Sequence, residues 1–153
     1  MGAPVTIRLA TGTHALDNVV LDGELAPSVL RLEADADEGG IVILSASSGA
    51  GTALLTIEAG APALIMIGLE LTSPLVVAGG SLHMINCTIR MASDGRRASE
   101  AAAGTGDAAR ARTVSGGEAV LDEVLLADNP GGAIVLSHGN LHVLRSRLAG
   151  NQA

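Results

Sequence analysis

The chain has 153 residues, of which 48% are hydrophobic and 20 are glycine, yet it contains no Phe, Tyr or Trp. This length suits one domain whose core is built in thin layers from aliphatic side chains. A formal net charge of -7 without a basic stripe disfavours binding to nucleic acid or to an anionic membrane. The missing rings also remove the usual stacking platforms for sugars and single-stranded nucleic acid.

Neither a membrane span nor a secretory signal is expected. Apolar runs such as residues 63–67 end well before the roughly 18–20 residues that a membrane helix needs. The N-terminus lacks a charged region followed by an apolar run.

The first half of the chain consists of short apolar segments separated by turn residues. Val5–Leu9 alternates apolar and polar side chains, and the Thr-Gly-Thr at 11–13 predicts a turn. Val19–Leu21 is a second strand, because Asp22-Gly23 behind it is a strong turn signal. Short strands about ten to twelve residues apart, with no helical period, predict an all-β chain. The further strands are expected at residues 29–32, 41–44, 54–57 and 64–67.

The second half contains three copies of one phrase, each starting at a glycine: residues 80–89 (GSLHMINCTI), 117–126 (GEAVLDEVLL) and 139–148 (GNLHVLRSRL). The last two glycines are 22 residues apart and the first two are 37 apart, the excess being an insert at about 92–110. Alignment of the copies, with a looser one at 60–71, predicts three columns: Leu64, Leu82, Ala119 and Leu141; Met66, Met84, Leu121 and Val143; Leu71, Ile89, Leu126 and Leu148.

A repeat near 22 residues, made only of short strands, suits one turn of a parallel β-helix, in which each coil pairs with the coils before and after it. We expect one domain over residues 1–153, with an inserted loop at 92–110 that contains a helical piece near 97–103. Asparagines recur at strand exits (Asn86, Asn129, Asn151), where Asn tolerates left-handed backbone. Outward positions are expected at Arg8, Arg31, Glu33, Glu58, Glu70 and Arg90.

Residues 79–89 (GGSLHMINCTI), and 131–136 (GGAIVL) with 148–153 (LAGNQA), resemble repeats of the pectin-lyase-like superfamily. They are also similar to repeats of polymorphic outer-membrane proteins and adhesins. The resemblance covers most of the chain, best from 64 to 153. It implies a single-stranded right-handed parallel β-helix of six to seven coils, and an extracellular or cell-surface location. It says little about function, because the superfamily contains lyases, hydrolases and non-catalytic surface proteins.

Catalysis in such a fold would need clustered carboxylates, either to bind Ca²⁺ beside a basic residue or to act as acid pairs on neighbouring coils. The densest cluster, at residues 33–38, holds four carboxylates in a flexible acidic connection, and a solvated loop is favoured over a Ca²⁺ site. Ser137-His138-Gly139 is faintly similar to the Gly-His-Gly of polygalacturonases. Its first glycine is replaced and partner acids are not apparent, so catalysis by His138 is disfavoured.

His83 and His142 occupy the same repeat position, with Val120 in the copy between them. Because coils are about 4.8 Å apart, the two histidines would be about 10 Å apart, too far to share a metal ion. They are interpreted as surface histidines. The single cysteine, Cys87, lies within a strand phrase and is interpreted as a buried small hydrophobe.

Two segments match the sequence motifs of covalent modifications and are interpreted as chance matches: the N-glycosylation triplet at 86–88 and the myristoylation pattern at 1–6. No catalytic, cofactor or metal site is therefore predicted. The favoured function is a non-catalytic scaffold, a structural, adhesive or interaction segment of a larger surface protein, with polysaccharide or another protein as partner. The alternative is a degenerate or truncated carbohydrate-active enzyme, a polysaccharide lyase or glycoside hydrolase. Enzymatic activity is left open and its absence is favoured.

The last copy of the phrase runs to residues 151–153 without a polar capping segment. An uncapped coil exposes a strand edge and part of the apolar core. The sequence therefore also predicts end-to-end self-association of the chain.

Overall fold

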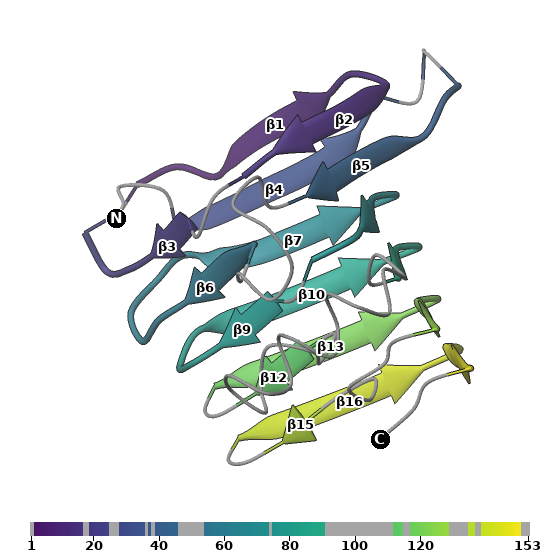
Figure 1. Cartoon of the computed structure of the whole chain (residues 1–153). Helices are drawn as coiled ribbons and strands as arrows, with labels where there is room; N and C mark the ends of the chain where they lie inside the picture. The colour runs from purple at the N-terminus through teal and green to yellow at the C-terminus, as the bar shows by residue number, and fades with distance from the viewer. Residues whose placement is uncertain are drawn as a thin grey trace.

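The structure is a computed structural model, and the residues that it describes contain strands and no helix (Figure 1). None of these residues forms a helix that is long and apolar enough to cross a membrane. The described residues are 2–16, 19–24, 28–35, 37, 39–45, 54–73, 75–90, 112–114, 117–128, 135–136 and 139–150.

The strands of the described residues form three sheets. The long sheet has the order β1 (Val5–Leu9), β4 (Val29–Ala34), β7 (Ala63–Ile67), β10 (Ser81–Ile85), β13 (Glu118–Asp122) and β16 (Asn140–Leu144). The second sheet has the order β2 (Gly12–Ala15), β5 (Val42–Ser45), β8 (Glu70–Leu71), β11 (Thr88–Ile89), β14 (Leu125–Ala127) and β17 (Arg147–Ala149). The third has the order β3 (Val19–Leu21), β6 (Leu55–Ile57), β9 (Leu75–Val77), β12 (Arg112–Val114) and β15 (Val135–Leu136).

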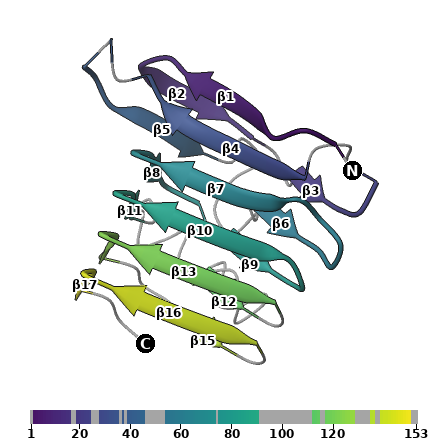
Figure 2. The ribbon, with the colours of Figure 1, turned by 180° about the vertical axis from the view of Figure 1, so that it is seen from behind.

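Successive strands along the chain belong to the three sheets in turn. Within each sheet, a strand pairs in parallel with the strand three places further along the chain. The result is a stack that runs from β1 to β16 in both views (Figures 1 and 2). In the described part of the chain, this arrangement confirms the all-β prediction with parallel strands and is consistent with a parallel β-solenoid. The long sheet contains six strands in the described residues.

The strand register confirms the columns predicted from the repeated phrase. Leu82 pairs with Leu64 on one side and with Ala119 on the other, and Ala119 pairs with Leu141. The column of Met84 and that of Ile89 agree with the prediction in the same way. The looser copy at 60–71 is therefore a true repeat.

The core lies between the sheets and follows from the two-residue alternation of each strand. In β7 and β10 the side chains of Leu64, Met66, Leu82 and Met84 are at most 1% exposed, whereas their neighbours in sequence are half-buried or exposed. Burial of each such side chain stabilises the fold by about 1.5–3 kcal/mol. Short aliphatic layers thus suffice, and the chain needs no aromatic residue to fill this space.

One turn prediction is wrong. Residues 11–13 were expected to form a turn, but Gly12–Ala15 is strand β2, which pairs with β5. The Gly12 N–H donates to the carbonyl of Ile41 at 3.0 Å, so pairing with the next repeat overrides the local turn signal. The insert at 92–110 and the residues Asn129, His138 and Asn151 lie outside the described residues.

Candidate functional site

The outer face of the long sheet changes in chemistry from one end of the stack to the other. Arg8 on β1, and Arg31 and Glu33 on β4, lie at one end. The middle is aliphatic, with half-buried side chains that we call the apolar stripe: Ile65, Ile67, Ile85 and Val120. Charged side chains return on β13, with Glu118 and Asp122. The face therefore carries an aliphatic strip between the charges of β1 and β4 and those of β13.

At the β1 end two arginines share one carboxylate, which leaves one positive charge in excess. Arg8 Nε donates to Glu33 Oε1 at 3.0 Å, and Arg31 Nε donates to Glu33 Oε2 at 2.8 Å. The hydrogen bond from Arg8, with further help from Arg31, lowers the pKa of Glu33. With Thr6 these residues line an open hollow of about 630 Å³. A ligand anion there could use only the guanidinium N–H groups that Glu33 leaves unused.

The bend between the long sheet and the second sheet is built in the same way in four successive repeats. Gly68, Asn86, Glu123 and Arg145 occupy it with φ of 70°, 51°, 55° and 47°. The N–H of each of the first three donates to a carbonyl of the next repeat at 3.0–3.1 Å. Left-handed backbone disfavours most side chains other than Gly and Asn. The left-handed geometry expected for Asn86 is confirmed. Glu123 adopts it because the bond of its N–H to the next repeat holds it there, and Arg145 adopts it at the last of these bends.

Charged side chains gather beside this bend. Arg145 Nε donates to Asp122 Oδ1 at 2.8 Å, and a second nitrogen of Arg145 donates to Oδ2 of the same carboxylate. This pair lowers the pKa of Asp122 and raises that of Arg145. Arg145 Nε also lies 3.7 Å from Glu123 Oε1. Each charge at this bend therefore has an opposite charge within reach.

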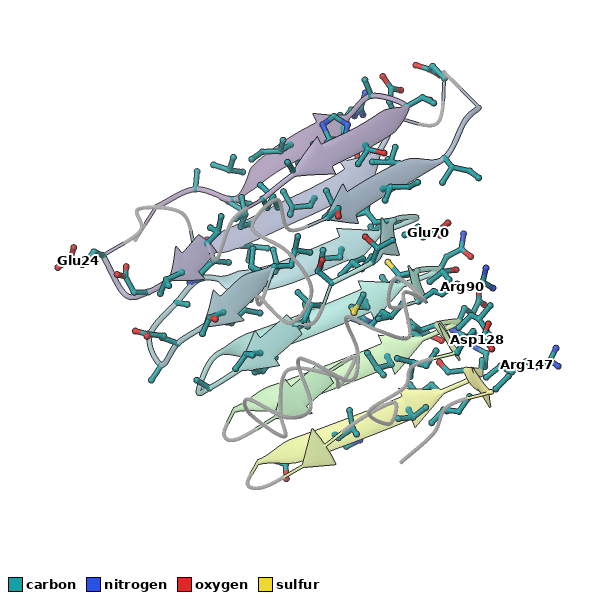
Figure 3. All side chains as sticks on the ribbon, viewed as in Figure 1. Glu24, Glu70, Arg90, Asp128 and Arg147 are labelled. Carbon is teal, nitrogen blue, oxygen red and sulfur yellow. The ribbon has the colours of Figure 1, made fainter. Side chains whose placement is uncertain are left out.

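The same balance extends along the second sheet. Figure 3 shows Glu70, Arg90, Asp128 and Arg147 following one another along one edge of the stack, with Glu24 on the opposite side. Arg90 Nε lies 3.6 Å from Asp128 Oδ2. Acids and bases alternate along this edge, so it presents no strong field of one sign to a charged ligand.

The acidic cluster at 33–38 does not act as a unit in the part that the structure describes. Glu33 points to the two arginines, while Asp35 Oδ1 accepts the N–H of Asp37 at 3.1 Å within a local turn. Glu38 lies outside the described residues. Among the described residues no three His, Cys, Asp or Glu side chains are close enough together to hold a metal ion.

The two histidines differ from each other. The register confirms that they share a position with Val120 between them. His142 is exposed, as expected, with Nε2 3.7 Å from Glu118 Oε1. His83 is only half exposed, and its Nε2 is shielded from solvent without a hydrogen-bond partner in the structure. The register partners of His83 are Ile65 and Val120 of the apolar stripe.

Cys87 is a buried thiol, as predicted, with 2% exposure. Its Sγ–H faces the carbonyls of Met66 and Ile85 at 3.4 and 3.3 Å. Burial raises the pKa of this thiol, so the reactive thiolate is disfavoured.

No protein-family model, curated protein or solved structure matches the chain. The likeness to pectin-lyase-like repeats therefore receives no support from a relative, and function must be argued from the residues themselves.

Sequence reasoning missed two features of this surface. It did not expect the ion pairs Glu33–Arg8 and Asp122–Arg145, which join side chains of different repeats. It also did not expect an apolar outer stripe. The signal for the stripe was the unbroken apolar run at 63–67, since a strand with one wet face alternates.

Proposed function

We propose that the chain is a non-catalytic scaffold, a right-handed parallel β-helix of the pectin-lyase-like type, and that it serves as an interaction segment of a larger surface protein. The matched columns support the coil architecture, because each repeat places the same side chains inward. The partner that suits the apolar stripe is another protein, since the stripe offers aliphatic contact and no aromatic ring for a sugar.

The observation that carries this proposal is the pairing of the acids on the outer face with arginine. Glu33 accepts hydrogen bonds from Arg8 and Arg31, and Asp122 accepts two from Arg145. Glu123 lies beside the same Arg145, 3.7 Å from its Nε. Glycoside hydrolysis needs a general acid with a raised pKa, whereas arginine lowers the pKa of Glu33 and of Asp122.

The competing function is a carbohydrate-active enzyme, and an activity assay separates the two. The purified chain would be incubated with polygalacturonate and pectin, with and without Ca²⁺, while reducing ends and unsaturated uronate are measured. The scaffold predicts no product above a no-protein blank. Product formation that disappears in His138→Ala, with the circular dichroism spectrum unchanged, would overturn the proposal in favour of the enzyme. Glu33→Gln and Asp122→Asn serve as matched variants for the outer-face acids.

A further inference from the structure

The apolar stripe lies on the outer face of the long sheet, in the middle of the stack (Figure 2). Ile65 and Ile67 on β7, Ile85 on β10 and Val120 on β13 point outward and are half-buried. All three strands pair with a neighbour on each side, so the stripe belongs to complete repeats. Adjacent aliphatic side chains on an outer face are typical of sites that contact another protein.

Two outward columns carry the stripe, and the strand register defines both. One contains Thr6, Arg31, Ile65, His83, Val120 and His142, and the other contains Arg8, Glu33, Ile67, Ile85, Asp122 and Leu144. The columns form a band that is two side chains wide and crosses six strands. Its centre lies between β7 and β10, which contribute three of the four aliphatic residues of the stripe.

The band carries a positive excess on the β4 side of the stripe. Arg8 and Arg31 share the carboxylate of Glu33, so two positive charges meet one negative charge. The side chain of Arg31 remains 46% exposed although it is paired. Part of its guanidinium group is therefore accessible to a partner on this face.

The other side of the stripe carries a negative excess. Three acids, Glu118, Asp122 and Glu123, lie on β13 or at the bend behind it, and Arg145 pairs with the last two. Glu118 stands apart from this group, with its side chain 55% exposed and His142 Nε2 at 3.7 Å. The two sides of the stripe thus differ in the sign of their excess charge.

A second copy can face this band through a two-fold axis that runs along the strands between β7 and β10. Rotation about this axis reverses the order of the strands and leaves each position along a strand unchanged. β7 of one copy then faces β10 of the other, with Ile67 on Ile85. β4 faces β13, with Arg31 on Val120, and Glu118 lies two residues before Val120 on the same face.

The charges favour this axis over a two-fold axis along the stack. An axis along the stack would place each strand opposite itself, and Arg8 and Arg31 of one copy would meet the same arginines of the other. The axis along the strands instead brings the positive side to the negative side. It also places Glu33 opposite Asp122, but arginine of the same chain covers each of these carboxylates.

From these observations we propose that the apolar stripe binds a second copy of this chain, face to face, in a two-fold dimer whose stacks run in opposite directions. The inference rests on the proposed function, because it names the partner of the interaction segment. Six strands of about five residues give a contact of roughly 400 Å² per copy. A contact of this size is weak and reversible, so the dimer is expected at high protein concentration.

The first test reverses the charges where Arg31 meets Glu118. Arg31→Glu and Glu118→Lys each bring like charges together twice in a dimer, because the two-fold axis repeats the contact. In an equimolar mixture the introduced glutamate meets the introduced lysine at one contact, and native Arg31 meets native Glu118 at the other. Arg147→Glu and Glu70→Lys make the same charge changes on the second sheet and are the matched controls.

Sedimentation equilibrium at low salt measures the dissociation constant, and circular dichroism checks that each variant is folded. The wild-type chain and the two controls should form the same dimer. Each reversal at the contact should weaken the dimer about ten-fold or more, since two attractive contacts become repulsive. The mixture of the two reversals should recover the wild-type dissociation constant.

A second test addresses the apolar part of the contact. Ile67→Lys should abolish the dimer, because an ammonium group would be buried against Ile85 of the other copy without a partner. Thr56→Lys adds the same group to a half-buried outward position on the third sheet and should leave the dimer unchanged. This pair keeps the proposal testable if Arg31→Glu, which places a second acid beside Glu33, lowers the stability of the fold.

Three results would overturn the proposal. A wild-type chain that stays monomeric at the highest concentration would leave the stripe to a different protein. A dimer that Ile67→Lys does not weaken would lie elsewhere on the molecule. A mixture that associates no better than its components would exclude the axis along the strands. None of these results bears on the polysaccharide assay, so failure of the dimer and failure of the scaffold function remain distinguishable.

Discussion

The middle and the ends of the stack contain the same kinds of side chain in the same columns, yet their environments differ greatly. Leu126 on β14 is fully buried, whereas Leu148, its partner on β17, is 51% exposed. Strand geometry and residue type are equal, so the difference comes only from the number of neighbouring repeats. Each repeat is incomplete by itself, and stability is a sum over contacts between neighbours.

The largest difference in stability between the middle and the ends is expected when the same Leu→Ala substitution is made once in each region. Leu126→Ala should lower the free energy of unfolding by about 2–5 kcal/mol, because it leaves a cavity inside a packed column. Leu148→Ala should cost less than about 1 kcal/mol, since half of this side chain already meets water. Urea denaturation at concentrations where the chain is monomeric measures both values. Equal losses at the two sites would contradict the view that neighbours determine the contribution of a column.

The columns could be predicted from the sequence because inward positions repeat the same chemistry. Leu64, Leu82 and Leu141 are recognisable as equivalent without a structure, and Gly80 and Gly117 set the alignment. The outer face could not be predicted in this way, because its residues change from repeat to repeat.

Pairing between neighbouring repeats decides the remaining features. The ion pair of Glu33 with Arg8 joins residues 25 positions apart. The strand at Gly12–Ala15 depends in the same way on β5. A repeated sequence pattern can identify an inward position, but it carries no information on which outward side chains contact one another.

A smaller effect is expected at the glycines that start the repeated phrase. Gly117 has φ of +72°, and a Cβ there would lie 2.8 Å from the backbone carbon of Gly79 and 2.9 Å from the nitrogen of Gly80. Gly39 has φ of +66° with open space around it. Gly117→Ala should therefore destabilise the chain by about 2–3 kcal/mol, and Gly39→Ala by only about 1 kcal/mol of backbone strain. Comparing the thermal unfolding of the two variants separates the steric clash at Gly117 from the backbone strain that both positions share. Similar losses of stability in the two variants would show that the close approach of the repeats is unimportant.

The smallest effect concerns the charged ends of the outer face and appears only with pH. Arginine lowers the pKa of Glu33 and of Asp122, so each ion pair stabilises the folded chain above the ordinary carboxyl pKa of about 4 and this stability is lost as pH falls through the lower, folded-state pKa. At neutral pH, Glu33→Gln and Asp122→Asn should each melt slightly below the wild type. The gap should close as the pH is lowered through that window, because protonation then removes the same charge from the wild-type carboxyl. A gap that persists in acid would mean that the amide disturbs packing and that the ion pairs contribute nothing. The middle repeats, whose outer face carries the apolar stripe, should show no such dependence: Ile67→Val should have a pH-independent effect, which makes it the control for the two charged ends.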